Sequence, residues 1–362
     1  MLPPIFQRPL WTGVAGVSSA HPLATKAGLN ILKAGGNAVD AAVAVSAALN
    51  VVEFYHTSLA GGGFGLLYWA ETGETMAIDF RGCAPKKATR DMFLGRLEDA
   101  AEGPQAVLVP GLLRGLGQIH SRYGRTSWDQ LWVDAIEIAE EGFYLGPAYA
   151  SITEFGIKKG RATRFEETAR TFLDKGRPYG AGKPFRQREL AQVMRTIQTE
   201  GPEGFYSGWV AERFLEGLDS LGGIITADDL VDYRSSITPA VQGIYQDVTC
   251  HTPGLPCGGG LQIIMMLNIL EQFDLKALGY SADYFQLLLQ ALEVGFAHRL
   301  EYFGDPRFVD DPTERLLSKE YARSLSLEGP MASGSSRPTG QGGTTHFVVA
   351  DAEGNVVSWT QT

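Results

Sequence analysis

The spacing of hydrophobic and polar positions predicts helices and strands that follow one another along the chain. A helix is predicted over Pro22–Lys33, where apolar residues recur at four-residue intervals before a Gly-Gly stop. Asp40 is expected to start a second helix, Ala41–Val51, which is apolar on nearly every side. A helix of that kind has to be buried on all its faces. The N-terminal third of the chain therefore predicts a central helix with other elements packed around it.

Strand-like alternation marks two hairpins. The first is expected from Phe64–Trp69 and Thr75–Phe80, and the second lies at the C-terminal end, where two β-branched runs flank a turn at 351–355. A helix is predicted to start after Thr226, which would cap it with Asp229 at the third position, and one strand is predicted over Val241–Thr252. Two amphipathic helices are predicted over Leu261–Phe273 and Ala282–Phe296, followed by a linker over Leu325–Gly343.

Composition and charge narrow the class of protein. The chain has 362 residues, 44% of them hydrophobic, so it can bury a sizeable core as one large domain or two. Its net charge of −10 argues against nucleic acid or an anionic membrane as partner. No run approaches the roughly 20 apolar residues of a membrane span, and residues 1–10 lack the pattern of a secretory signal. We therefore expect a cytoplasmic chain whose three cysteines are reduced.

The strongest candidate chemistry lies near the C-terminal end. An uncharged, glycine-rich stretch ending at Gly343 leads into Thr344, at the mouth of the predicted hairpin. A threonine hydroxyl in this position can attack its own preceding carbonyl, and hydrolysis of the resulting ester frees a new α-amine. That amine, with an ordinary pKa of about 8, can act as the base for the adjacent hydroxyl. Taken alone, a Thr-Thr pair more commonly marks an ordinary edge strand after a loop.

Other motifs give weaker signals. Arg81 follows a predicted strand and precedes Gly82, so its planar fork could hold a carboxylate, although an ion pair with Asp79 is the alternative. The triple glycine at 61–63 has the wrong spacing for a dinucleotide fingerprint and more simply lets the backbone pass close to another element or to substrate. The six histidines show no metal-ligand spacing. We predict no metal and no cofactor.

An ordered series of motifs from about Gly16 to Thr362 resembles one known family. They are Ser19–Thr25, Gly35–Ala42, Gly61–Phe64, Asp79–Arg81 followed by Ala84-Pro85, Val109–Gly111, Gly204–Tyr206, Gly222–Thr226, Tyr302–Pro306 and Thr344–His346. Together they resemble the γ-glutamyltransferase (γ-glutamyl transpeptidase) family of N-terminal-nucleophile hydrolases. Each motif is weak by itself, and their common order makes the resemblance specific.

The resemblance implies a fold and a set of site residues. The implied fold is α+β, a four-layer αββα N-terminal-nucleophile hydrolase sandwich, incomplete at the C-terminus. Residues 1–343 would be a large-subunit-like region and 344–362 the first strands of a truncated small-subunit-like region. By the same resemblance the peptide between Gly343 and Thr344 is the processing site and Thr344 the catalytic nucleophile. Thr362 would support the nucleophile during processing, and Arg81 would hold the α-carboxylate of a γ-glutamyl group.

Three departures from the family pattern bear on these expectations. Where the family usually has Pro-His-Ser-Ser-Gly-Ile-Gly-Gly-Gly-Gly, this chain has Phe-Tyr-His-Thr-Ser-Leu-Ala-Gly-Gly-Gly at residues 54–63. Where the family has Pro-Pro-Ser-Ser-Gly-Gly, this chain has Leu-Pro-Cys-Gly-Gly-Gly at residues 255–260. Related acylases and amidases share the framework, so another acyl group is a second interpretation. The family's small subunit also continues past Thr362 and supplies oxyanion glycines.

These observations lead to three functional hypotheses. The first is an autoprocessed γ-glutamyl acyl transferase and hydrolase, which acts on glutathione or a related γ-glutamyl amide and passes the acyl group to water or an amine. In that case the large and small subunits come from one precursor, with neither nucleic acid nor membrane as partner. The second is an amidohydrolase or acylase of the same framework. The third is an inactive fragment, because the chain alone would lack the oxyanion donors.

Overall fold

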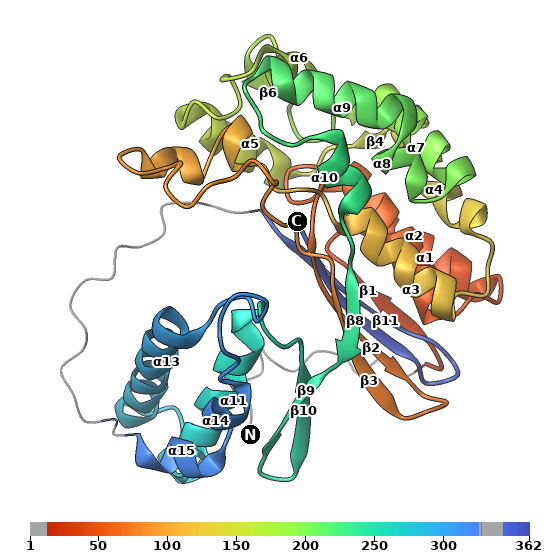
Figure 1. Cartoon of the computed structure of the whole chain (residues 1–362). Helices are drawn as coiled ribbons and strands as arrows, with labels where there is room; N and C mark the ends of the chain where they lie inside the picture. The colour runs from red at the N-terminus through yellow and green to blue at the C-terminus, as the bar shows by residue number, and fades with distance from the viewer. Residues whose placement is uncertain (1–12, 326, 328–342) are drawn as a thin grey trace. The chain divides into compact units, whose positions relative to one another are not determined.

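The computed structural model describes residues 13–325, 327 and 343–362 (Figure 1). By its internal contacts the chain divides into two units, the first made of residues 1–63, 80–234 and 342–362 and the second of residues 64–79 and 235–341. The N-terminal arm, residues 1–10, and most of the expected linker Leu325–Gly343 lie outside the described residues. Within the described ranges, no helix has the length and apolar character needed to cross a membrane.

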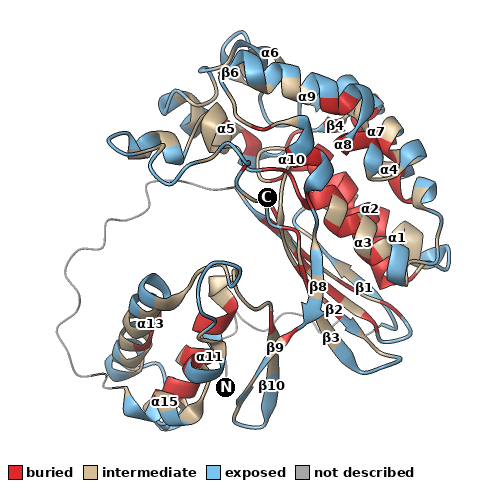
Figure 2. Cartoon of the chain, in the orientation of Figure 1, coloured by how far each residue is buried: buried red, intermediate tan, exposed pale blue. Residues whose placement is uncertain are grey.

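A pair of helices forms the centre of the first unit. Helix α1 spans Pro22–Lys33, as predicted. Helix α2 spans Ala38–Val52, and all of its residues are buried, so it is drawn in red in Figure 2. The expected start at Asp40 is wrong by two residues. Asn37 caps the helix by accepting the backbone N–H groups of Val39 and Asp40, while the Asp40 carboxylate accepts the N–H of Asn37 in return.

Helices α1 and α2 pack on an antiparallel group of three strands in the same unit, β1 (Gly16–Ser18), β11 (Thr345–Ala350) and β12 (Val356–Gln361). Helix α1 contacts β1, and α2 contacts β11 and β12. Their order is β1-β11-β12. Residues at alternate positions of β11 and β12 are fully or almost fully buried, namely Phe347, Val349, Val357, Trp359 and Gln361. This two-residue period is the one that predicted the C-terminal hairpin, and the hairpin is confirmed.

Further helices and short strands complete the first unit. The helices are α3 (Leu112–Tyr123), α4 (Val133–Glu141), α5 (Pro147–Lys158), α6 (Glu166–Phe172), α7 (Arg188–Glu200), α8 (Glu203–Tyr206), α9 (Gly208–Ser220) and α10 (Ala227–Asp232). Two-residue strands pair as β4 (Phe143–Tyr144) with β7 (Pro184–Phe185) and β5 (Leu173–Asp174) with β6 (Arg177–Pro178), and 3-10 turns span Leu97–Ala100, Pro104–Ala106 and Trp128–Trp132. The predicted Thr226–Asp229 capping box of α10 is confirmed.

The second unit combines antiparallel strands with a small helical core. Strands β2 (Gly63–Trp69), β3 (Glu74–Asp79) and β8 (Ser236–Pro239) pair in that order, and the predicted β2–β3 hairpin is confirmed. The helices are α11 (Gly258–Leu270), α12 (Leu275–Leu278), α13 (Ala282–Tyr302), α14 (Thr313–Leu316) and α15 (Lys319–Ser324). Met265, Ile269 and Leu270 of α11 form their common core with Ala291 and Leu316.

Three sequence predictions in the second unit need correction. The helix expected over Leu261–Phe273 is α11, which begins and ends three residues earlier, at Gly258 and Leu270. The single strand expected over Val241–Thr252 is a hairpin of β9 (Val241–Tyr245) and β10 (Val248–Thr252), because the chain turns at Gln246 with a positive φ of 56°. Helix α13 continues past the expected Phe296 to Tyr302. Across both units, helices and antiparallel strands occupy separate stretches of the chain, and the α+β class is confirmed.

Candidate active site

Two threonine hydroxyl groups meet at the open end of the β11–β12 hairpin. The antiparallel register pairs Thr345 with Gln361, which puts Thr344 and Thr362 opposite each other one residue further out. Their Oγ1 atoms are 3.1 Å apart. Thr344 Oγ1 also donates to the carbonyl oxygen of Gly343 at 2.8 Å. Because that bond uses the only hydroxyl proton of Thr344, the proton between the two hydroxyl groups comes from Thr362.

The triple glycine holds the end of β12 by close backbone contact. Thr362 donates its N–H to the carbonyl oxygen of Gly62 at 3.0 Å. A Cβ atom on Gly61 would lie 1.6 Å from the carbonyl oxygen of Thr362, and one on Gly63 would lie 2.0 Å from that of Thr360. No side chain fits at either position, so glycine is required by this approach and not by a turn.

Gly343 is held in the same way on the other side of the hydroxyl pair. A Cβ atom on Gly343 would lie 2.7 Å from the carbonyl oxygen of Tyr55 and 2.8 Å from Cα of His56. Gly343 and Thr362 therefore both contact the single stretch of chain from Tyr55 to Gly63. This stretch is one of the two that depart from the family pattern.

Arg81 reaches the same glycine stretch through its backbone. A Cβ atom on Gly62 would lie 3.3 Å from Cα of Arg81, and the hydroxyl of Tyr233 donates to the carbonyl oxygen of Arg81 at 2.7 Å. Arg81 is exposed. The structure thus places Arg81 beside Gly62, which itself bonds Thr362, and its role toward a substrate carboxylate stays a prediction.

His346 lies next to the two threonines, and the sequence pattern had assigned it no role. Strand alternation puts His346 on the same face of β11 as Thr344, and its Nδ1 lies 2.8 Å from the Oγ1 of Thr360, its cross-strand partner. Burial lowers the pKa of His346 from its ordinary value, so the neutral imidazole is favoured at pH 7. The sequence could have indicated that His346 lies beside Thr344, because residues two apart in a strand lie on the same face.

The residues that the structure describes contain no candidate metal site. There, no group of three or more histidine, cysteine, aspartate or glutamate side chains could hold an ion. The three cysteines, Cys83, Cys250 and Cys257, form no disulfide bond with one another and are partly buried.

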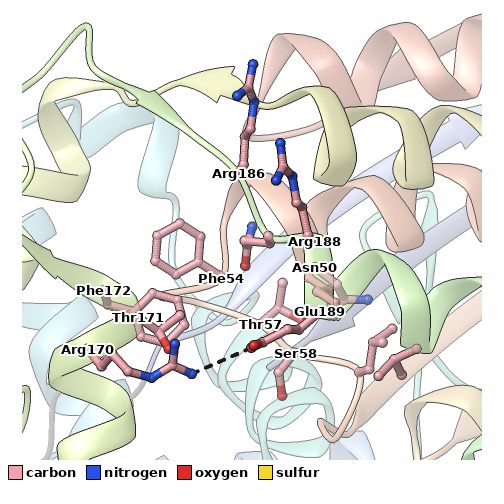
Figure 3. Close-up of a pocket in the computed structure, with 14 residues that line it drawn as sticks. Asn50, Phe54, Thr57, Ser58, Arg170, Thr171, Phe172, Arg186, Arg188 and Glu189 are labelled. Atoms are coloured by element: carbon pink, nitrogen blue, oxygen red, sulfur yellow. Dashed lines mark hydrogen bonds and ion pairs between the residues drawn. The ribbon is translucent and has the colours of Figure 1, made fainter.

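A pocket of about 770 Å³ opens in the first unit beside the Tyr55–Gly63 stretch (Figure 3). Phe54 and Phe172 stack in its wall with ring centroids 4.9 Å apart. Arg170 and Glu189 form an ion pair across it at 3.7 Å, drawn as the dashed line in Figure 3. Its other lining residues include Asn50, Thr57, Ser58, Leu59, Leu190 and Val193. Sequence reasoning missed this pocket because its walls come from segments more than 100 residues apart.

The fold has close counterparts among solved structures. The structure of Helicobacter pylori γ-glutamyltranspeptidase matches with a TM-score of 0.84 and 35% sequence identity, over 88% of this chain and 92% of that chain. This chain thus has the fold of the N-terminal-nucleophile hydrolases, the four-layer αββα class, of which the described residues include the layer of α1 and α2 and the strands it covers.

A model of the γ-glutamyltranspeptidase family matches residues 24–362, and the chain belongs to that family. The glutathione hydrolase proenzyme of Escherichia coli (strain K12) is 36% identical over 96% of the chain. The acylase ACY 1 proenzyme of Pseudomonas sp. (strain V22) is 37% identical over 97% of it. The chain spans 62% of the length of the first relative and 66% of the second.

Proposed function

We propose that the chain belongs to an enzyme that cleaves itself between Gly343 and Thr344 and then uses Thr344 as an N-terminal nucleophile on γ-glutamyl amides. The observation that carries this proposal is the position of the Thr344 hydroxyl, 2.8 Å from the carbonyl oxygen of Gly343 and 3.1 Å from the Thr362 hydroxyl. Residues 1–343 and the region that begins at Thr344 would then be the two subunits of one precursor.

In self-cleavage, Thr344 Oγ1 attacks the carbonyl carbon of Gly343. The peptide C–N bond breaks, an ester links Gly343 to the threonine oxygen, and the α-amine of Thr344 takes up the hydroxyl proton. Water then hydrolyses the ester and leaves a carboxylate on Gly343 and a free hydroxyl on Thr344. Thr362 supports the step because its hydroxyl donates to the attacking oxygen and orients it.

In turnover, the same hydroxyl attacks the γ-amide carbon of the donor. The free α-amine of Thr344 accepts the hydroxyl proton and passes it to the leaving amine. Water or an acceptor amine then takes the acyl group from the threonine oxygen. The amine has to be neutral to act as a base, so the rate is expected to rise with pH up to about 8.

Mass analysis of the purified gene product that contains this chain tests the proposal. The wild-type protein should give two pieces that separate at the Gly343–Thr344 bond. Thr344→Ala should give one, since alanine has no hydroxyl to attack the carbonyl. Thr344→Ser is the matched control, because it keeps the hydroxyl and should still cleave. A wild-type protein that hydrolyses γ-glutamyl-p-nitroanilide while it remains uncut would contradict the mechanism.

A second candidate is an acylase that takes a different acyl group. It is favoured by the altered Phe54–Gly63 stretch and by the similarity to the ACY 1 proenzyme. Two anilides separate the candidates: γ-glutamyl-p-nitroanilide, which carries the α-amino group, and glutaryl-p-nitroanilide, which lacks it. Preference for the glutaryl substrate would favour the acylase.

A further inference from the structure

A closed circuit of four buried polar side chains lies directly behind Thr362. The Ser46 hydroxyl donates to Oε1 of Gln361 at 2.6 Å, and Nε2 of Gln361 donates to the Thr57 hydroxyl at 3.0 Å. Thr57 in turn donates to Oδ1 of Asn50 at 3.0 Å, and Nδ2 of Asn50 donates back to the carbonyl oxygen of Ser46 at 3.0 Å. The four residues are at most 3% exposed.

The circuit joins three parts of the first unit. Ser46 and Asn50 lie one turn apart on α2, Thr57 lies in the stretch that contacts Gly343 and Thr362, and Gln361 is the last residue of β12. Every bond runs in one direction around the circuit, which fixes the orientation of both side-chain amides. The Gln361 side chain therefore has one position in which Oε1 and Nε2 both form hydrogen bonds.

Packing alone does not account for an amide at residue 361. The neighbouring residues on the same face of β12, Val357 and Trp359, are apolar and fully buried. An apolar side chain at 361 would bury as well, whereas an amide costs free energy unless it is hydrogen-bonded. What the amide adds is geometric precision, because hydrogen bonds have strict distances and angles and apolar contacts do not.

We propose that the Ser46–Asn50–Thr57–Gln361 circuit is a positioning device for self-cleavage, which sets the end of β12 so that the Thr362 hydroxyl meets Thr344. The inference rests on the proposed function. Gln361 faces α2, so Thr362, the next residue of an extended chain, faces the opposite side, where Thr344 lies. A small shift of Gln361 moves Thr362 by a comparable amount. A misplacement of about 1 Å can slow a positioned reaction about 100-fold.

Substitutions of Thr57 test the positioning role most directly, because one variant can remove the hydroxyl group and keep the side-chain shape while another keeps the hydroxyl group. Thr57→Val keeps the shape and removes both circuit bonds, whereas Thr57→Ser keeps the hydroxyl. The measurement is the first-order rate of cleavage at Gly343–Thr344, followed by intact mass on freshly purified protein. We expect Thr57→Val to cleave about tenfold more slowly or worse, and Thr57→Ser to stay within about twofold of wild type. Ser358→Ala, on the opposite face of β12, is the control and should also cleave normally.

The outcomes are distinct. Normal cleavage by Thr57→Val, or equal slowing by Thr57→Ser and Thr57→Val, overturns the positioning role while the proposed function stands. A wild-type protein that never cleaves overturns both. If thermal unfolding shows that Thr57→Val does not fold, Ser46→Ala replaces it in the test. This substitution removes one hydroxyl group from the other side of the circuit. Slowed cleavage by Ser46→Ala supports the positioning role, and a normal rate overturns it.

Discussion

Glycine and threonine have complementary roles at the Gly343–Thr344 peptide. The threonines contribute exposed hydroxyl groups, and the glycines at 61, 63 and 343 let three backbones approach within distances that a Cβ atom would prevent. Any substitution of Gly61 would push Thr362 away. The separation of the two hydroxyl groups therefore depends on residues that have no functional groups of their own.

Arg81 provides a prediction at this scale. If its guanidinium holds the substrate carboxylate, Arg81→Lys should weaken apparent binding of γ-glutamyl-p-nitroanilide by about 1.5–3 kcal/mol. Lysine keeps the positive charge but lacks the planar fork that makes the second hydrogen bond. Steady-state kinetics of the mature enzyme measures this as kcat/KM. γ-Aminobutyryl-p-nitroanilide, which lacks the carboxylate, is the matched control and should be affected little. An equal loss on both substrates would show that Arg81 has a structural role.

At the scale of single elements, the N-cap of helix α1 is His21, a side chain that can change its charge with pH. His21 Nδ1 accepts the backbone N–H of Leu23 at 3.2 Å, which only an unprotonated nitrogen can do. Burial lowers the pKa of His21, although the nearby Glu53 carboxylate acts in the opposite direction. The folded-state pKa therefore lies below the unfolded value of about 6.5. The unfolded chain binds the proton more readily, so the contribution of His21 to stability is full above about pH 6.5 and is lost as the pH falls through its folded-state pKa.

We accordingly expect wild-type protein to lose more stability than His21→Asn between pH 7.5 and pH 5. Asparagine keeps a cap acceptor and does not titrate. Urea unfolding of both proteins at the two pH values measures the difference, in which the contributions of all other titrating groups cancel. Parallel pH dependence in the two proteins would show that His21 is not the responsible group.

Element boundaries show where local patterns were sufficient. Helix α1 and the β11–β12 hairpin follow from side-chain spacing within one segment, and the structure confirms them. The start of α2 was wrong because a capping box let the helix begin before its first long apolar run. The turn at Gln246 was missed because its positive φ occurs at a residue type that carries no turn signal.

At the scale of the whole first unit, Asp351 links the hairpin to the helical layer. Its Oδ2 accepts the N–H of Ala38, the first residue of α2, and the side-chain amide of Asn355, each at 2.9 Å. Its Oδ1 accepts the backbone N–H groups of Glu353 and Asn355, each at 3.0 Å. Asp351 is 7% exposed, so its loss would leave buried donors unpaired.

Asp351→Ala should therefore lower the free energy of unfolding by about 3 kcal/mol. Glu353→Ala is the matched control from the same turn: it removes an exposed ion pair with Arg125 and should cost less than about 1 kcal/mol. Denaturant unfolding of the two variants beside wild type checks both values. Similar losses in the two variants would indicate that Asp351 does not link hairpin and helix as described.

Local chemistry in the sequence was enough to predict helix α1, the burial of α2 and Thr344 as a candidate nucleophile, because helix and strand periods, caps and motifs act over a few residues. The α+β class and the place of Thr362 in the site came from the family resemblance. The approach of Gly61 to Thr362, the contact of Asp351 with Ala38 and the circuit through Gln361 were decided by the tertiary structure. Each joins residues about 300 positions apart, and no local period carries information on which distant strand will pack on which helix. The pocket beside Phe54 has the same origin, since its walls meet only once the chain has folded.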